Sequence, residues 1–312
     1  MSNERPVLVL NPAAAGGRVG RNRDALVDRI RAALPDLDVV ESGPSGARQV
    51  AMAAVNAGAT HVLSLGGDGT HSQVGGAIID AQKQPGSVRF SPLPAGTGGD
   101  FSRLLRGERR IERVLQHVHE EGTVIDAAAV TLRDHQGNLR RQPFINVGSF
   151  GVAGLVDEAV NRSSKRWGGT IAFGAASVAS FFQYRPAPMR ISVDGVVVFE
   201  GPIVNAAVCN GQYYGGGMWV GSRARLLDGL LDLVIFPALP LHRILPIFAA
   251  TYRGHHLDHP AVVWKQGRVI EAVATDIHSA WADIDGEPLG VEPYRVEVLP
   301  GVLRVTGLRA DV

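Results

Sequence analysis

The sequence predicts an α/β domain built on a parallel sheet, followed by a C-terminal β-sandwich. Short apolar runs alternate with helical patterns over the first third of the chain, which is typical of a parallel sheet with helices on both faces. After about Asp126 the pattern changes to closely spaced β-branched runs, which favours a sandwich. The length of 312 residues fits two domains of about 150 residues each. We place them at residues 1–127 and 128–299.

Apolar runs and helical periodicity locate the elements of the first domain. A continuous apolar run indicates a strand covered on both faces, and the spacing of Leu26, Ile30, Ala33 and Leu34 puts one apolar stripe on a helix. The expected strands are Val7–Leu10, Leu37–Val40, His61–Leu65 and Phe90–Leu93, and the expected helices are Arg21–Leu34, Ala47–Ala57, one through Val74 and Ile78, and one from about Phe101.

The second part reads mainly as short strands separated by Gly, Pro, Asp or Asn. Asp194-Gly195 between two runs is a strong hairpin signal. Two helical segments, Gly169–Tyr184 and about Leu241–Thr251, interrupt the strands. The expected strands are Val124–Leu132, Pro143–Val147, Arg190–Val193, Val196–Phe199, Ile203–Cys209, Leu231–Phe236, Val269–Ala274, Ala282–Asp285, Tyr294–Leu299 and Val302–Val305.

Composition excludes several classes of protein. Hydrophobic residues make up 45% and charged residues 20% of the chain, which argues against disorder. The net charge of +1 gives no general reason to expect a nucleic-acid partner. A single cysteine, Cys209, excludes an intrachain disulfide and fits a reducing cytoplasm. No apolar stretch reaches the ~18 residues of a membrane span, so we expect any membrane contact to be peripheral.

Three glycine-rich segments follow predicted strands, and they carry the functional argument. We call them the first (Asn11–Arg18), second (Gly66–Thr70) and third (Pro94–Asp100) glycine turns. In a parallel sheet the carboxyl ends of the strands share one edge, and glycines before a helix let the main chain approach a phosphate. The three turns together therefore predict a nucleotide-phosphate site. None ends in Gly-Lys-Ser/Thr, so a P-loop is excluded.

Asp68 in the second glycine turn needs its own explanation, because a carboxylate repels phosphate. A divalent cation between the two groups, or a proton-transfer role, would account for it. Taken alone, this segment reads equally well as a structural turn, and Asp285-Gly286-Glu287 reads more readily as a β-turn than as a catalytic segment. Only the combination of motifs raises the functional interpretation.

These motifs, with Ile125-Asp126, Phe144–Gly151, Asn210-Gly211, Gly215–Gly217, Leu227–Asp232 and Asp285–Glu287, resemble the diacylglycerol kinase catalytic-domain family, which includes bacterial lipid kinases, sphingosine kinases and ceramide kinases. The resemblance runs in order along nearly the whole chain. It implies a fold like that of NAD kinase and diacylglycerol kinase, with residues 300–312 returning to the first domain.

The resemblance also implies roles for individual residues. ATP would lie on the second glycine turn, near strand-end residues of the neighbouring turns. Asp285 would take the proton from a lipid hydroxyl, with Glu287 and Asp68 completing the catalytic group. The implied nucleotide contacts are Asn11, Ser42, Gly66, Gly67, Asp68, Gly69, Thr70 and Thr97.

Two magnesium sites are implied as well. Arg225, Asp228 and Leu230 would hold a structural ion, for which an ordinary Asp-Gly turn is an alternative of similar weight. Asp100 and Asp126 would join Asp68 around a catalytic ion; a purely local hydrogen-bonding role for Asp126 stays open.

The chain departs from the family pattern at Ser72, Gln73 and Gly99, where the family usually has Asn, Glu and Asn. These changes put nucleotide preference in question. The leading interpretation is a magnesium-dependent kinase that moves the γ-phosphoryl group of ATP to a diacylglycerol-like or sphingoid lipid. An NAD kinase and a non-catalytic lipid-binding regulator are the alternatives, and a homodimer is left open.

Two further segments suit a lipid substrate. The apolar side of the Thr170–Tyr184 helix could line an acyl-chain groove, although such a stripe is more often core. Arg162, Lys165, Arg166 and Trp167 combine basic and aromatic side chains suited to anionic headgroups, although a solvated loop is the simpler explanation.

Overall fold

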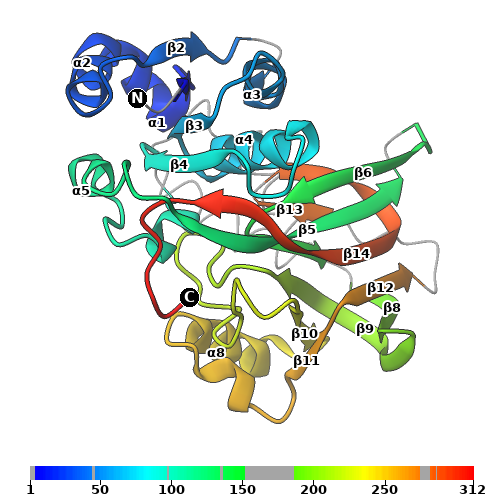
Figure 1. Cartoon of the computed structure of the whole chain (residues 1–312). Helices are drawn as coiled ribbons and strands as arrows, with labels where there is room; N and C mark the ends of the chain where they lie inside the picture. Colours follow the sequence, from blue (N-terminus) through cyan, green and yellow to red (C-terminus); the bar gives the residue numbers. More distant parts are fainter. Residues whose placement is uncertain are drawn as a thin grey trace.

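The computed structural model describes residues 4–43, 46–96, 98–133, 136–151, 186–274, 282–285 and 287–312. For residue 187 and residues 287–293 the structure describes only the backbone. A mixed sheet runs through the molecule in the order β11-β10-β9-β7-β13-β14-β4-β3-β1-β2, with the parallel strands and their helices at one end and the antiparallel strands at the other (Figure 1). The predicted fold class, an α/β part with a parallel sheet and a β-sandwich part, is confirmed.

The first part is a parallel sheet covered by helices. β3 pairs in parallel with both β1 and β4, and β1 also pairs with β2. β1 and β3 are buried along their whole length, and β1 is the unbroken apolar run expected of a strand that is covered on both faces. The strands are β1 (Pro6–Leu10), β2 (Asp38–Glu41), β3 (His61–Gly66) and β4 (Arg89–Pro94), within two residues of the predicted bounds.

The helices of this part follow the strands in sequence. The predicted Arg21–Leu34 helix is α2, and the segment before it is not a plain turn: it forms the short helix α1, in which Ala15 and Gly16 have left-handed φ values of 53° and 64°. The elements are α1 (Ala14–Arg21), α2 (Arg23–Ala33), α3 (Gly46–Asn56), α4 (Asp68–Ala81), the 3-10 helix η1 (Phe101–Leu104) and α5 (Ile111–Leu115).

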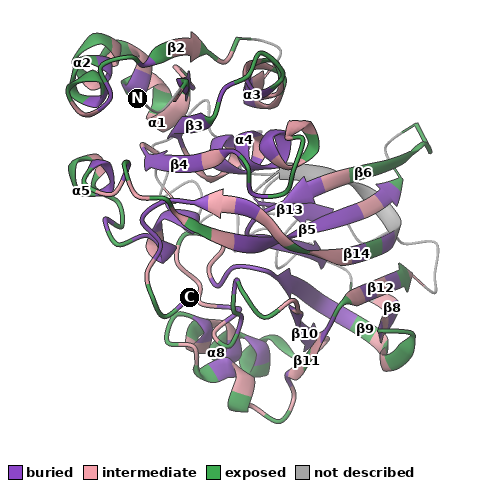
Figure 2. Ribbon diagram, in the orientation of Figure 1, coloured by how far each residue is buried: buried purple, intermediate pink, exposed green. Residues whose placement is uncertain are grey.

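α4 joins the two parts of the molecule. It is buried from Thr70 to Ile78 except at Gln73, which is half-buried (Figure 2), because one side packs on the sheet and the other on the antiparallel part. A Cβ on Gly75 would lie 2.9 Å from Ile145 Cγ2, and one on Gly76 would lie 3.2 Å from the Pro143 carbonyl oxygen. The absence of side chains at these glycines brings α4 close to β6 and β7.

The second part is antiparallel. Its core lies between its strands. β9 is a single strand where the sequence predicted two, Val196–Phe199 and Ile203–Cys209, because Gly201 lets the chain continue without a turn. The strands are β5 (Thr123–Arg133), β6 (Leu139–Phe144), β7 (Val147–Gly151), β8 (Ala187–Val193), β9 (Val196–Cys209), β10 (Leu231–Pro237), β11 (Val263–Gly267), β12 (Val269–Ala274), β13 (Ala282–Ile284) and β14 (Glu287–Val305).

β14 crosses from one part to the other. It pairs antiparallel with β5, β12 and β13, and then parallel with β4 through Arg304 and Val305. Beyond the strand, the Thr306 amide donates to the Phe90 carbonyl at 3.0 Å and the Arg309 amide to the Leu104 carbonyl at 2.9 Å. The last residues therefore lie against β4 and η1.

Helical segments complete the second part. The predicted Leu241–Thr251 helix is confirmed as α8, and the 3-10 helix η2 (His255–Asp258) follows it. The predicted Gly169–Tyr184 helix and the basic segment from Arg162 to Trp167 lie outside the described residues. Within the described ranges, no helix is long and apolar enough to cross a membrane.

Candidate functional site

The ends of β1, β3 and β4 bring the three glycine turns together. The Ala95 amide donates to the Gly66 carbonyl at 2.8 Å, and a Cβ on Gly96 would lie only 2.5 Å from the Gly67 Cα. Asn11 Nδ2 donates to Thr70 Oγ1 at 3.0 Å. The second and third turns therefore touch backbone to backbone, and the first is tied to the second through a side chain.

The second glycine turn leaves the start of α4 open to an anion. Gly67 is the N-cap, and it has no side chain with which to satisfy the first amides of the helix. These amides carry the positive end of the helix dipole. A Cβ on Gly66 would lie 2.4 Å from Thr70 Oγ1, so only glycine fits beside that hydroxyl. This arrangement suits a phosphate group.

Ser42 and Thr97 are the remaining predicted nucleotide contacts. The Ser42 amide donates to the Leu10 carbonyl at 2.8 Å, which places this half-buried residue just beyond the carboxyl end of β2. Thr97 lies outside the described residues, and Gly96 and Gly98 flank it.

The carboxylates of Asp68, in the second glycine turn, and Asp100, at the end of the third, face each other. Asp68 Oδ1 accepts a hydrogen bond from the Phe101 amide at 3.0 Å, and Asp100 Oδ2 accepts one from the Gly216 amide at 2.8 Å. A Cβ on Gly98 would lie 2.7 Å from Asp68 Oδ2 and 4.0 Å from Asp100 Oδ2. Burial, and then the charge of Asp68, raises the pKa of Asp100 to about 6.

This pair of carboxylates fits a divalent cation. Asp100 Oδ1 is buried and has no hydrogen-bond partner; the nearest cation is Arg103, whose Nε lies 3.8 Å away. A hard cation with oxygen ligands would satisfy this atom and relieve the repulsion from Asp68. Among the described residues no group of three or more His, Cys, Asp or Glu side chains gathers, so water or phosphate oxygens would complete the coordination.

Asp126 lies on β5 and binds the main chain. Its Oδ1 accepts from the Gly301 amide at 2.8 Å and its Oδ2 from the Gly229 amide at 2.7 Å. Asp126 therefore has a hydrogen-bonding role, but its partners are 103 and 175 residues away along the chain and not local. It joins β5, β14 and the segment after Asp228.

Asp126 also anchors the segment from Arg225 to Leu230, which the sequence suggests for a structural ion. Asp228 Oδ1 accepts from the Leu230 amide at 3.0 Å, which closes a turn around Gly229 with its φ of 70°. Arg225 and Asp228 are exposed, and Leu230 is half-buried. An oxygen-lined turn at the surface is compatible with a cation and equally with an ordinary Asp-Gly turn.

Asp285 is buried against α4 and β7. Its Oδ1 accepts from the Asn146 and Val147 amides at 3.1 and 2.8 Å, and its Oδ2 from the Ile145 amide at 3.1 Å. The Ser72 hydroxyl also hydrogen-bonds to it. Burial nevertheless dominates and raises its pKa to about 6.

The hydrogen bond between Ser72 and Asp285 settles how far the acidic turn lies from the glycine turns. Ser72 is on α4, five residues after Gly67, a rise of about 7 Å along the helix. Asp285, with a left-handed φ of 51°, is thus brought to the same region as the second glycine turn, as the sequence predicts. Glu287 is the first residue of β14 and pairs with Ile284; its side chain is outside the description.

Two of the unusual residues of this chain have structural partners. Ser72 donates to Asp285, and Gln73 Oε1 accepts from the Ala47 amide at 3.0 Å, at the start of α3. Gly99 has a left-handed φ of 66°, which glycine adopts without strain.

The sequence did not reveal the supports of Asp285. Asn210 Nδ2 donates to the Ile145 carbonyl at 2.8 Å and Asn146 Nδ2 to the Tyr213 carbonyl at 2.7 Å. A Cβ on Gly211 would lie 2.1 Å from Asn146 Oδ1. These contacts fix the segment whose amides hold Asp285. The only signal in the sequence was the Asn210-Gly211 pair at a strand end, and it does not indicate that these residues contact Ile145 and Asn146.

Fold and site together define a two-part protein with an anion-binding sheet edge, a carboxylate pair and a buried acidic turn. The family described as diacylglycerol kinase catalytic domain matches residues 5–130, and the family described as YegS C-terminal NAD kinase beta sandwich-like domain matches residues 146–307. The chain belongs to the diacylglycerol kinase catalytic-domain family, with the C-terminal part of the YegS type.

Similar proteins agree with this assignment along nearly the whole chain. A protein named diacylglycerol kinase from Mycobacterium tuberculosis is 25% identical over 294 residues, covering 94% of this chain and 89% of its own. A probable lipid kinase, YegS-like, from Pseudomonas aeruginosa is 27% identical over 98% of this chain and 95% of its own. A solved structure described as a putative diacylglycerol kinase from Bacillus anthracis has a TM-score of 0.76 at 22% identity, covering 99% of this chain and 98% of that one.

Proposed function

We propose that the protein is a lipid kinase that transfers the γ-phosphoryl group of ATP to a hydroxyl of a diacylglycerol-like or sphingoid lipid, with magnesium. The observation that carries this proposal is the position of Asp285, a buried carboxylate bound to α4 near the glycine turns. The names of similar proteins, diacylglycerol kinase and lipid kinase, support the substrate class.

In the proposed reaction the protein mostly positions groups and balances charge, as is general for phosphoryl transfer. The phosphates of ATP lie on the first amides of α4, within reach of Thr70 and Asn11. Asp68 and Asp100 would hold the magnesium ion, which would supply positive charge to offset that of the phosphates. Asp285 accepts the proton of the lipid hydroxyl as the oxygen bonds to the γ-phosphorus and ADP leaves.

The environment of Asp285 suits a general base. A pKa of about 6 leaves the carboxylate ionised at pH 7 while making it a stronger base than an exposed aspartate. The three amides that hold it also fix its orientation. Glu287 is proposed to lie beside it, and Arg225, Asp228 and Leu230 are proposed to hold a structural magnesium ion.

A lipid acceptor implies contact with a membrane. We therefore propose a cytoplasmic protein that associates with the membrane surface from one side; we leave its oligomeric state to measurement.

The proposal is tested by incubating purified protein with γ-labelled ATP, magnesium and a panel of acceptors. The panel contains diacylglycerol, ceramide and sphingosine in mixed micelles, and NAD in detergent-free buffer. We expect label in a lipid product. Label in NADP instead would establish the NAD kinase alternative, and folded protein that labels no acceptor would favour a non-catalytic lipid-binding role.

A further inference from the structure

α8 covers the end of the antiparallel part that lies farthest from β1–β4 (Figure 1). One side of this helix is core: Ile244, Ile247 and Thr251 are buried, and the two isoleucines pack with Val234 and Phe236. These positions follow the 3.6-residue period of a helix that rests on a sheet. Phe248, which is half-buried, packs against the same core and stacks on Phe236.

A second apolar stripe on α8 faces solvent. Leu241, Leu245 and Tyr252 are 36%, 49% and 58% exposed, and Ala249 between them is also exposed. At 100° per residue these positions fall within a sector of about 80°. Large exposed apolar side chains aligned along one helix mark a contact surface more often than chance scatter does. We call these residues the α8 stripe.

The charge around the α8 stripe has one sign. The segment from Ala238 to Leu257 contains no Asp or Glu, but it contains Arg243, Arg253 and several histidines. Arg253 and His242 flank the stripe on the side away from the core. The first carboxylate after it, Asp258, is paired with Arg223 at 3.0 Å. The surroundings of the stripe are therefore basic.

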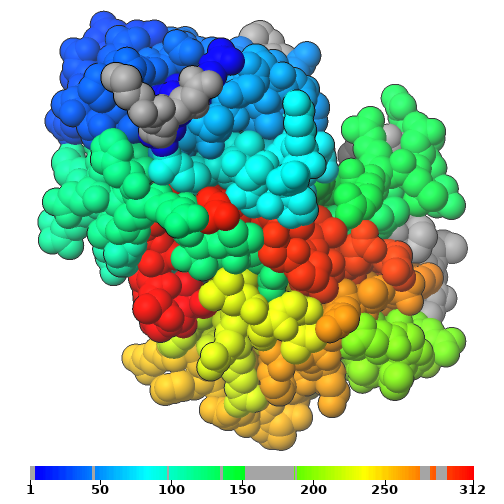
Figure 3. Space-filling view, viewed as in Figure 1, coloured from blue at the N-terminus to red at the C-terminus, as the bar shows by residue number. Residues whose placement is uncertain are grey.

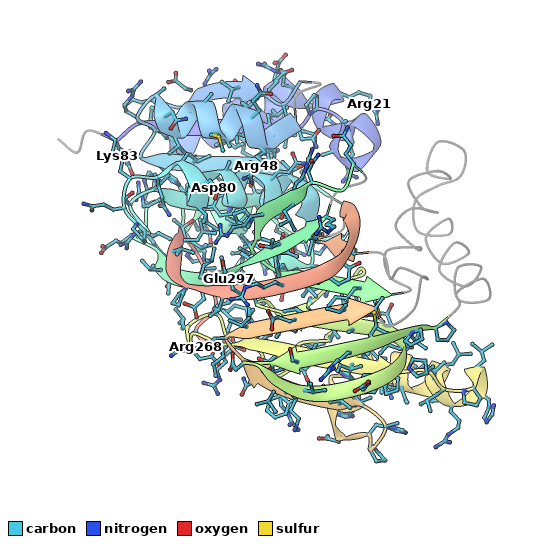
Figure 4. The ribbon with its side chains drawn as sticks, turned by 90° about the vertical axis from the view of Figure 1, so that its right-hand side faces the viewer. Arg21, Arg48, Asp80, Lys83, Arg268 and Glu297 are labelled. Carbon is cyan, nitrogen blue, oxygen red and sulfur yellow. The ribbon has the colours of Figure 1, made fainter. Side chains whose placement is uncertain are left out.

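We propose that the α8 stripe and its arginines dock the protein on an anionic phospholipid bilayer. An amphipathic helix with leucine and tyrosine on one face and arginine beside them is suited to the headgroup region of such a membrane. In Figure 4, α8 lies at the lower right and Arg21, at the end of α1, lies at the upper right, so the two are on the same edge of this view but at opposite ends of the molecule. The biological reason for docking rests on the proposed lipid substrate.

A second copy of the chain fits this surface less well. A stable dimer usually buries about 800 Å² on each partner, and the α8 stripe offers three large side chains on one short helix. A two-fold contact would also bring the same arginines face to face. In the space-filling view the segment around α8 forms a rounded, outward-facing end of the molecule (Figure 3). An extended anionic surface matches both the shape and the charge.

The test is flotation of the full-length protein with vesicles of phosphatidylcholine alone or with 30 mol% phosphatidylglycerol. The test variant is Leu241→Asp/Leu245→Asp. The matched control is Val196→Asp/Val197→Asp, which adds the same two charges on apolar residues that are 66% and 42% exposed at the start of β9. We expect the parent and the control to bind the anionic vesicles equally, and the test variant to bind at least tenfold more weakly.

A second pair of measurements tests the charge. Arg253→Gln should weaken binding to anionic vesicles about fivefold and should leave binding to neutral vesicles unchanged. Raising the salt from 0.1 to 0.5 M should weaken parental binding in the same way. An arginine variant that binds like the parent would overturn the electrostatic part of the proposal.

The outcomes separate docking from catalysis. Kinase activity on lipid in detergent micelles should be the same in the parent and the α8 variants, whereas activity on vesicle lipid should fall with binding. Vesicle binding that depends on α8 in a protein without kinase activity would support docking and reject the proposed function. Full vesicle binding by Leu241→Asp/Leu245→Asp would overturn docking, and so would a parental dimer that this variant converts to a monomer.

Discussion

Replacing Asp285 with asparagine should lower activity at least about 100-fold while leaving the fold nearly as stable as the parent. The carboxylate is buried, and its pKa is raised from an ordinary value of 3.8 to about 6. At 1.36 kcal/mol per pH unit, this rise corresponds to about 3 kcal/mol. Because the folded pKa is the higher one, ionisation of Asp285 destabilises the fold. The free energy of unfolding falls as pH rises from about 4 to about 6, and the full loss of about 3 kcal/mol is present at pH 8.

Asparagine removes that cost but introduces another. Oδ1 of Asp285 accepts from the Asn146 and Val147 amides, and Oδ2 accepts from the Ile145 amide. If the amide oxygen keeps the first two bonds, its NH₂ group faces the Ile145 N–H and that hydrogen bond is lost, at a cost of about 1–3 kcal/mol. The two effects oppose each other. We expect the free energy of unfolding at pH 8 to change by no more than about 2 kcal/mol.

Activity responds differently, because the amide has no basic oxygen. General-base catalysis contributes about 10²–10⁴ in rate, so kcat for lipid phosphorylation should fall at least about 100-fold. Urea unfolding at pH 8 and labelled-ATP turnover measure the two quantities on the same preparation. A variant that keeps activity within threefold of the parent would refute the role of Asp285 as base, and one that is unfolded in buffer would refute the balance worked out above.

Three further substitutions test the rest of the site. Gly96→Ala places a Cβ 2.5 Å from the Gly67 Cα, so it should weaken nucleotide binding tenfold or more by calorimetry; unchanged affinity would separate these turns from the nucleotide. Asp100→Asn removes a buried carboxylate with a raised pKa, so the melting temperature without metal should stay the same or rise. Half-maximal activity should need at least tenfold more magnesium, and an unchanged magnesium requirement would contradict the role of Asp100. Ser72→Ala removes a donor that lowers the pKa of Asp285, so the acidic limb of the kcat/KM profile should move to higher pH; a shift to lower pH would contradict the assignment.

The sequence predicted the first part of the fold well, because its signals are local. Buried parallel strands such as Pro6–Leu10 are continuous apolar runs, and this strand is followed by a glycine turn. The rule that parallel strands end at one edge then predicted that Gly67 and Gly96 would meet. Their backbone contact follows from geometry that any sheet of this kind shares.

The second part was harder to predict, because long strands carry turn-like residues. Pro300-Gly301 suggested a break, yet β14 continues through it for 19 residues. The pairing with β5 shifts register between Leu299 and Leu303, and the Gly301 amide donates to Asp126. A bulge satisfied by a distant carboxylate has no local signature.

The site shows the same limit. The sequence singled out Asp285, but its hydrogen bonds come from Ser72 and from the amides of residues 145–147, which are more than 130 residues away along the chain. Main-chain amides have no sequence signal of their own. The departure at Ser72, which put nucleotide preference in question, places a hydroxyl on the proposed base.

The proposed mechanism requires the glycine turns, which bind ATP, and Asp285, which deprotonates the lipid hydroxyl, to act at one reaction centre. A crystal structure with magnesium and a non-hydrolysable ATP analogue tests this most directly. We predict that the terminal phosphate lies at the start of α4, with the cation between it and Asp68 and Asp100, and with the Asp285 side of the site open to an acceptor. Nucleotide bound away from the Gly66–Thr70 segment, or a terminal phosphate that no acceptor could approach from the side of Asp285, would contradict the account.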